Sequence, residues 1–212
     1  MRVESSFERL LAILAPYQQG ANFPPPATET ELQALETHVG RHLPDQLKAM
    51  WKVCNGGPFI ARDRISECLF YSYMFMSVSQ VLEHFESMRE ILRPPNMPEL
   101  QEPIPSFPEG AVQGELYSAS WLAFAHDFAG GHLAVDFAPG PSGVVGQVVN
   151  YGRDDLAHFQ LGSSVDAFLE RVICDYEHKR LHHVFGDQMM YVDRLLMTQQ
   201  EQGGRVWFKY PG

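Results

Sequence analysis

The sequence predicts an α+β fold in which helices pack against a central, mainly antiparallel sheet. Three observations lead to this prediction. The chain of 212 residues is long enough to bury the core of one domain, and 45% of its residues are hydrophobic. Apolar residues recur at helical spacing in much of its first half. Short apolar runs between glycine- and proline-rich turns occupy residues 121–161, a pattern typical of antiparallel hairpins.

Two helices are predicted near the start of the chain. Ser5 and Thr28 are each followed three residues later by a glutamate, a pattern that caps helix N-termini through reciprocal hydrogen bonds. Apolar residues at helical spacing follow both caps. The first helix should end near Tyr17, because the prolines at 24–26 cannot continue it. The second should continue to about Val39.

Three further elements are predicted before the middle of the chain. A helix over residues 44–54 should stop at Asn55-Gly56-Gly57, whose glycines we expect to take the left-handed conformation that closes many helices. The aromatic-rich run at residues 68–76 predicts one strand. Another helix should begin at Ser77 or Ser79 and end at a pair of prolines.

A proline-rich insertion near residues 94–113 precedes the main block of strands. Strands are predicted at residues 121–124, 132–136, 144–151 and 158–161. Pro139, Gly140 and Gly143 specify a tight connection between two of them, and we expect Gly143 to adopt backbone angles that a β-branched residue cannot. A helix from residue 163 or 164 should follow the last strand.

We expect the chain to be organised around one domain. Residues 1–27 should form an N-terminal helix and a proline-rich linker, and residues 28–176 the domain itself. Residues 177–212 should form a C-terminal extension that packs on the same domain. This extension contains a possible helix from Asp187 and a strand-like run at residues 206–208.

The charge and the cysteines argue against several classes of protein. The chain has 26 acidic and 16 basic side chains, and its formal net charge of −10 disfavours direct contact with nucleic acid or an anionic membrane. The apolar run from Leu10 to Ala15 is too short for a membrane span and lacks the flanks of a secretory signal. Three widely spaced cysteines suit a reducing compartment. We therefore expect a cytoplasmic protein, whose oligomeric state the sequence leaves open.

One stretch of the chain carries acidic side chains but no basic ones. No lysine or arginine occurs between Arg93 and Arg153. Much of this stretch should be surface loop, so it predicts an acidic face that attracts a basic protein, with a solvated face that has no partner as an equal alternative. The candidate partner-binding residues are Glu115, Trp121, Asp127, Asp136, Gln147, Asp154 and Asp155.

Catalytic and metal-binding patterns are weak. His126 and Asp127 are adjacent, but neighbours on a strand point to opposite faces, so a hydrolase that uses this pair is only a minor alternative. Cys174, His178 and His182 could line one helix face, but the outer two would lie ~12 Å apart along the axis, too far to share a zinc ion. We expect no catalytic residue, no cofactor and no bound metal.

Asn55-Gly56-Gly57 and, more specifically, Asp136-x-x-Pro139-Gly140-Pro141-x-Gly143-x-x-Gly146-Gln147 resemble motifs of the SUKH superfamily. This superfamily joins fungal regulators of cell-wall assembly and glucan synthesis to bacterial toxin-immunity proteins. The resemblance implies an α+β fold and brings no general catalytic motif. Its structural signature residues in this chain are Asn55, Gly56, Gly57, Pro139, Gly140, Gly143 and Gly146.

The resemblance implies a non-catalytic, protein-binding function. We expect a bacterial immunity protein that binds and neutralises a cognate toxin domain, and a basic toxin such as a nuclease fits the acidic stretch. The alternative is a regulatory scaffold in cell-wall or glucan synthesis, as in the fungal members. The signature residues themselves favour a structural role, because short polar residues beside glycine and proline usually serve turns.

Overall fold

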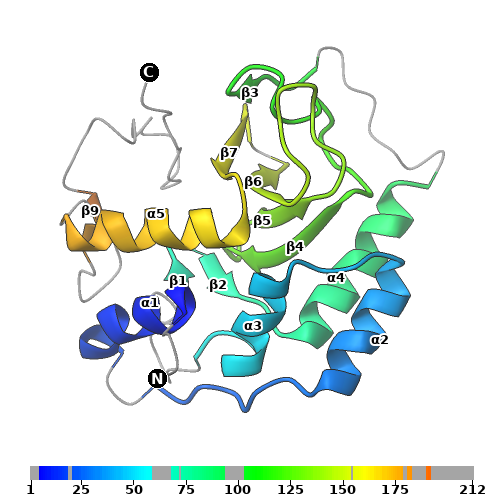
Figure 1. Cartoon of the computed structure of the whole chain (residues 1–212). Coiled ribbons are helices and arrows are strands. Elements are labelled where there is room, and N and C mark those ends of the chain that lie inside the picture. Colours follow the sequence, from blue (N-terminus) through cyan, green and yellow to red (C-terminus); the bar gives the residue numbers. More distant parts are fainter. Residues whose placement is uncertain are drawn as a thin grey trace.

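The computed structural model describes residues 5–18, 21–58, 68–71, 73–93, 103–153, 155–178, 181–182 and 190–191. A seven-stranded sheet lies at the centre of this part of the chain (Figure 1). Its strands are β1 (Cys68–Phe70), β2 (Tyr73–Phe75), β3 (Ser106–Phe107), β4 (Trp121–His126), β5 (Gly131–Asp136), β6 (Gln147–Gly152) and β7 (His158–Gly162). The spatial order is β1-β2-β4-β5-β6-β7-β3, and all neighbours are antiparallel except β3 and β7. The predicted α+β class with a mainly antiparallel sheet is therefore confirmed.

Helices flank the sheet. They are α1 (Ser6–Leu14) with its 3-10 continuation η1 (Ala15–Tyr17), α2 (Glu29–Val39), α3 (Asp45–Val53), α4 (Val78–Ile91) and α5 (Val165–Glu177). Capping boxes at Ser5, Thr28 and Ser77 begin α1, α2 and α4. In Figure 1, α1 lies beside α5 and α2 lies beside α4. The helix starts that the sequence predicts from its capping residues are confirmed.

The run at residues 68–76, which we expected to be one strand, forms two. The chain reverses at Tyr71, whose φ of +57° is left-handed. Tyr71 is buried, and its hydroxyl donates a hydrogen bond of 2.9 Å to the carboxylate of Asp175 in α5. This long-range bond holds a backbone conformation that a tyrosine rarely takes, and it has no local signal in the sequence.

Two further elements differ from the expectation. The proline-rich insertion contributes β3, which pairs with β7 in parallel and is extended by a hydrogen bond from the His158 amide to the Pro105 carbonyl. In the C-terminal extension, β8 (Leu181–His182) pairs with β9 (Met190–Tyr191), so residues 190–191 are a strand where we expected a helix from Asp187. The strand-like run at 206–208 lies outside the described residues.

No helix in the described ranges is both long and apolar enough to cross a membrane. Cys54 and Cys68 are buried and Cys174 is partly exposed, and in the described structure none of the three forms a disulfide. Burial raises the pKa of the Cys54 thiol to about 12, so this thiol remains protonated and unreactive near neutral pH.

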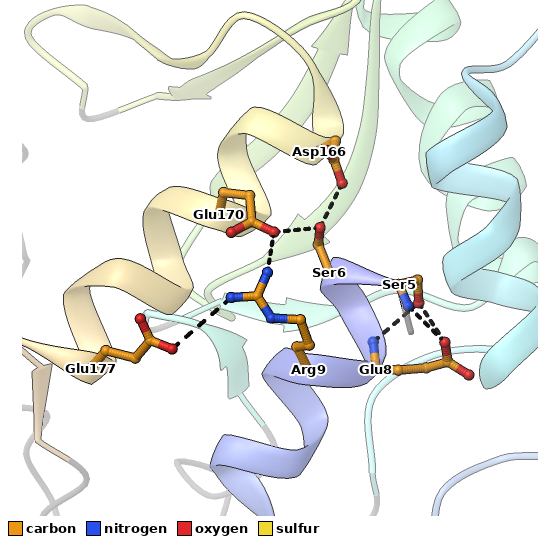
Figure 2. Close-up of polar contacts among 7 residues, drawn as sticks. All are labelled: Ser5, Ser6, Glu8, Arg9, Asp166, Glu170 and Glu177. Atoms are coloured by element: carbon orange, nitrogen blue, oxygen red, sulfur yellow. Dashed lines mark hydrogen bonds and ion pairs between the residues drawn. The ribbon is translucent and has the colours of Figure 1, made fainter. Parts of the chain in front are cut away.

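Helix α1 is integrated into the same hydrophobic core as the sheet. Phe7, Leu10 and Leu14 are buried in it. Polar contacts from α1 to α5 add to this packing (Figure 2). The Ser6 hydroxyl, which has a single proton to donate, lies 2.7 Å from an oxygen of Asp166 and 2.6 Å from an oxygen of Glu170. Arg9 pairs with Glu170 at 2.6 Å and approaches Glu177 at 4.0 Å, so α1 is held on α5 by both burial and charge.

Truncation of the α1 core should destabilise the whole domain. Leu10 is fully buried, so Leu10→Ala should lower the free energy of unfolding by about 2–5 kcal/mol. Arg9→Ala is the matched control on the same turn, because its ion pairs are half-exposed and contribute at most about 1 kcal/mol. Denaturant unfolding of both variants checks this prediction, and equally small losses would contradict the placement of α1 in the core.

Candidate functional site

The most specific motif of the sequence forms a buried hydrogen-bond network where β5 joins β6. Asp136 ends β5, Gln147 begins β6, and the two are register partners with fully buried side chains. The Gln147 amide donates to the Asp136 carboxylate at 2.9 Å and to the Ala111 carbonyl at 2.8 Å. Its oxygen accepts the Val144 amide at 3.0 Å. We call these four residues the Gln147 network, and it joins three segments of chain by direct hydrogen bonds.

The glycines of this motif are explained by close backbone contacts. The Gly140 amide donates to the Ala111 carbonyl at 3.0 Å, which fastens the β5–β6 connection to the insertion. A Cβ atom at Gly143 would lie 2.1 Å from that same carbonyl oxygen. Our expectation of a left-handed Gly143 is wrong, because only Gly146, with φ of +87°, is left-handed in this motif. Gly143 is required by space instead of by its backbone angles.

The Asn55-Gly56-Gly57 motif connects α3 to β2 and α4. The Asn55 side chain accepts the Val78 amide at 2.8 Å, and the Gly57 amide donates to the Phe75 carbonyl at 2.8 Å. Gly56 is left-handed, with φ of +116°, whereas Gly57 is not, so that part of the expectation is wrong. In both motifs, the hydrogen bonds described above join segments of the protein itself, as a structural role requires.

A methyl group at Gly143 should disrupt the β5–β6 connection. Gly143→Ala should lower the free energy of unfolding by more than about 2 kcal/mol, because the Ala111 carbonyl has to move to make room for the methyl group. This loss is typical of an extra methyl group in a closely packed site. Gly146→Ala is the control, since it has open space around it and should lose only the ~1–2 kcal/mol of left-handed strain. Thermal unfolding checks this ranking, and a Gly146 variant that is the less stable of the two would refute it.

A layer of histidine and aromatic rings covers the sheet beneath α4. His84 of α4 lies 4.2 Å from His132 of β5, and His132 stacks on Tyr151 of β6 at 5.1 Å, measured between ring centroids. His84 also shares a hydrogen bond of 2.7 Å with the Tyr151 hydroxyl. Burial, with a smaller contribution from neighbouring histidines, lowers the pKa of His84 to about 4 and that of His132 to about 3. Both rings are therefore neutral at pH 7, and no sequence motif pointed to them.

Acidification should destabilise the protein through this layer. Both pKa values are lower in the folded state than the ordinary value of 6.5, so the unfolded chain binds protons first as the pH falls. The stability that the neutral rings contribute is complete above about pH 6.5 and is lost toward pH 4 and below. The double variant His84→Gln, His132→Gln should lose less stability than the wild type between pH 7 and pH 4.5, by on the order of 2–3 kcal/mol for each of the two histidines. Urea unfolding at each pH measures this difference. Equal losses of stability in both proteins would show that His84 and His132 do not cause the acid destabilisation.

Two predicted partner-binding residues, Asp127 and Asp155, lie on neighbouring turns of the sheet. A Cβ atom at Gly131 would lie 2.6 Å from Asp127, and one at Gly152 would lie 3.4 Å from Asp155. Gly131 and Gly152 are register partners, so the β4–β5 and β6–β7 turns are neighbours. An exposed apolar residue follows each aspartate. Phe128, after Asp127, is 45% exposed, and Leu156, after Asp155, is 72% exposed. We call Asp127, Phe128, Asp155 and Leu156 the hairpin-tip face.

The turn that carries Phe128 is held rigidly. One oxygen of Asp127 accepts the amides of Ala129 and Gly131, both at 2.8 Å. Phe128 is left-handed, with φ of +62°, and its ring lies 4.5 Å from the His126 ring. A phenylalanine at such a φ is uncommon and strained, which marks the position as a candidate contact site. No sequence pattern predicts this backbone conformation.

The other predicted partner-binding residues are placed differently. Trp121 is 3% exposed and Asp136 and Gln147 are 0% exposed, so a partner cannot touch them directly in this structure. Burial raises the pKa of Asp136, and the charge of nearby Glu115, which is itself exposed, adds to that rise. Asp154 lies outside the described residues. Of the acidic candidates, the structure therefore places Asp127 and Asp155 on neighbouring turns.

The residues considered for catalysis or metal binding have other contacts. The His126 ring accepts the Phe128 amide at 3.3 Å, while the Asp127 carboxylate accepts amides of its own turn. Cys174 and His178 lie 3.4 Å apart from sulfur to nitrogen, and the side chain of His182 is outside the described residues. Within the ranges that the structure describes, no three His, Cys, Asp or Glu side chains are placed to hold a metal ion.

The fold and the two motif networks define the chain as a SUKH domain. The chain belongs to the SMI1/KNR4 family (SUKH-1), whose family model matches residues 26–171, more than half of its length. Helix α1 lies outside the matched residues, although it shares their core.

The relatives of the chain include three fungal proteins. It is 42% identical over 119 residues to the cell wall biosynthesis/cell cycle regulator smi1 of Schizosaccharomyces pombe, which covers 50% of this chain and 24% of that protein. It is 24% identical over 183 residues to the cell wall assembly regulator SMI1 of Saccharomyces cerevisiae, covering 72% of this chain and 35% of that protein. It is 37% identical over 70 residues to a glucan synthesis regulatory protein of Neurospora crassa, covering 33% of this chain and 13% of that protein. The matches thus span about a third or less of these relatives.

Proposed function

We propose that this chain is a non-catalytic, protein-binding module that acts in the regulation of cell-wall or glucan synthesis. The observation that carries the proposal is its membership of the SMI1/KNR4 family, together with relatives whose names describe regulators of the wall and of glucan synthesis. These names favour the regulatory scaffold over the toxin-immunity function that we first expected from the sequence. Both functions require a binding surface, so the structural argument for binding is the same.

The geometry supports binding more than catalysis. The polar groups of the Gln147 network form hydrogen bonds with other groups of the protein. Because these groups are already occupied, they are not available to bind a substrate. His126 and Asp127 are engaged with backbone amides of their own turn. Exposed apolar and acidic side chains lie instead on the turns of the sheet, a composition that suits contact with a protein.

A chimera tests the proposal in the yeast relative. The segment of Saccharomyces cerevisiae SMI1 that aligns with this chain is replaced by this chain, and the chimera is expressed in a strain that lacks SMI1. If the module carries the regulatory function, the chimera should restore the glucan content of the wall toward that given by intact SMI1. A form with the segment deleted should not.

The control chimera carries Gly143→Val, which should disturb the β5–β6 connection and reduce the restored glucan content. Immunoblotting establishes that each form accumulates. A wild-type chimera that accumulates normally but restores no more glucan than the deleted form would count against the proposed function.

A further inference from the structure

We propose that the surface beneath helix α1 binds a basic amphipathic helix of a partner protein, which takes the place of α1. This inference rests on the proposed protein-binding function and assigns to it a surface and a class of partner. We call this surface the α1 site, and its residues are Phe70 of β1, Phe75 of β2, and Asp166, Glu170 and Glu177 of α5.

The α1 site already holds one amphipathic helix. Phe7, Leu10 and Leu14 form the apolar face of α1, and none of them is more than 2% exposed. The Phe7 ring lies 5.6 Å from the Phe75 ring and 6.4 Å from the Phe70 ring, measured between centroids. A helix of nine residues is marginal in water on its own, so α1 is helical because this surface supports it. The α1 site therefore has the chemistry of a helix-recognition surface, with anchors at positions i, i+3 and i+7.

Helix α1 is an addition to the family domain. The family model matches residues 26–171, and α1 ends before that range begins. Beside the start of the range, the Pro25 carbonyl accepts the Asn55 amide at 3.1 Å. The Ala27 amide donates to the Trp51 carbonyl at 2.8 Å. These bonds do not involve α1, so α1 can be replaced while they stay in place.

Charge is the reason why the α1 site favours another helix over α1. Three carboxylates of α5, Asp166, Glu170 and Glu177, face α1 (Figure 2). The sequence of α1 contains one cation, Arg9, which pairs with Glu170 at 2.6 Å and lies 4.0 Å from Glu177. To Asp166 α1 offers the Ser6 hydroxyl, whose single proton Glu170 also attracts. A helix with a second cation at the position of Ser6 would pair with both carboxylates, so the α1 site favours a basic helix.

A second copy of this chain is a poorer occupant than a basic partner. Its α1 would bring the same single cation to the same three carboxylates. The α1 of the chain itself also competes, at the high effective concentration that a short tether provides. A partner helix with a further cation gains an ion pair over α1, whereas a second α1 gains none.

The experiment uses the full chain and two synthetic peptides. The α1 peptide has the sequence of residues 5–18, and the basic peptide differs from it only by Ser6→Arg. The binding of both peptides to each form of the chain is measured by titration and by thermal unfolding.

Variants of the chain test the proposed contacts. Leu10→Ala weakens the α1 that the chain carries, and Leu10→Val does so more mildly if Leu10→Ala does not fold. The exchange variant Arg9→Glu, Glu170→Arg keeps an ion pair between α1 and α5 but places a cation where the basic peptide needs an anion. The control variant Glu90→Arg, Arg93→Glu makes the same exchange in an exposed ion pair at the end of α4. Both exchanges are made in the same Leu10 variant, where the competing α1 is weak.

Both peptides should raise the melting temperature of Leu10→Ala, because they supply the apolar face that this variant lacks. They should bind Leu10→Ala at least about tenfold more tightly than the wild type, whose own α1 competes better. The basic peptide should bind about two- to fivefold more tightly than the α1 peptide, and salt should weaken this preference. The exchange variant should bind the basic peptide about tenfold more weakly, whereas the control variant should leave its binding unchanged.

Displacement of α1 is observed by NMR on an isotope-labelled Leu10→Ala chain with unlabelled basic peptide. The amide signals of residues 6–14 should move to the positions of an unfolded segment. The signals of β5 and β6 should remain dispersed, because the sheet stays folded around the peptide.

Three results would overturn the proposal. The peptides do not stabilise the Leu10 variants, the basic peptide binds no more tightly than the α1 peptide, or a peptide binds while the signals of residues 6–14 stay in place. Analytical ultracentrifugation adds a fourth. A dimer of the wild-type chain that Leu10→Ala dissociates would show that the α1 of a second copy occupies the site.

The SMI1 chimera separates failure of the α1 site from failure of the proposed function. If the wild-type chimera and its Arg9→Glu, Glu170→Arg form restore wall glucan equally, the regulatory function stands and the proposed partner is wrong. If the wild-type chimera restores no glucan while the peptides displace α1, the wall function is wrong and the α1 site stands.

Discussion

The side-chain amide of Gln147 makes the hydrogen bonds on which the order of the sheet depends. It binds the end of β5 through Asp136, the insertion through Ala111, and its own connection through Val144. Gln147, Asp136 and Ala111 lie in the interior, where an unpaired polar group would cost about 1–3 kcal/mol. The network is thus stable only when every member is present, and this requirement excludes alternative registers of β5 and β6.

The Gln147 network and the hairpin-tip face lie at opposite ends of the same pair of strands. The β5–β6 ladder runs without a bulge from Asp136 paired with Gln147 to Gly131 paired with Gly152. A register fixed at the first pair therefore also fixes the second, where the two turns meet. The motif residues act on the exposed turns through this ladder, which explains how buried residues can matter for a surface that they do not touch.

Much of the fold could be predicted from local patterns. The capping residues Ser5 and Thr28 locate two helices because a cap acts within one turn of its own chain. Tyr71 and Phe128 could not be predicted as left-handed, because contacts with distant parts of the chain or with a rigid turn hold them there. The sequence predicts that position 143 needs a glycine, but it does not predict the reason. The reason is the carbonyl of Ala111, which comes from a different segment of the chain. Of the candidate site, the sequence supplied the aspartates and the aromatic Phe128 near them, but not the exposed Leu156.

Burial divides the aspartates that the sequence treated as one group. Asp136 uses both carboxylate oxygens inside the protein, one for the Ala138 amide and one for Gln147. Asp127 satisfies two amides of its turn with Oδ1 alone, so the turn needs an acceptor oxygen there but not a charge. Asparagine would supply the same acceptor, so the charge of Asp127 acts beyond the hydrogen bonds of its turn. Burial lowers the pKa of the neighbouring His126 ring, and the charge of Asp127 offsets part of that fall.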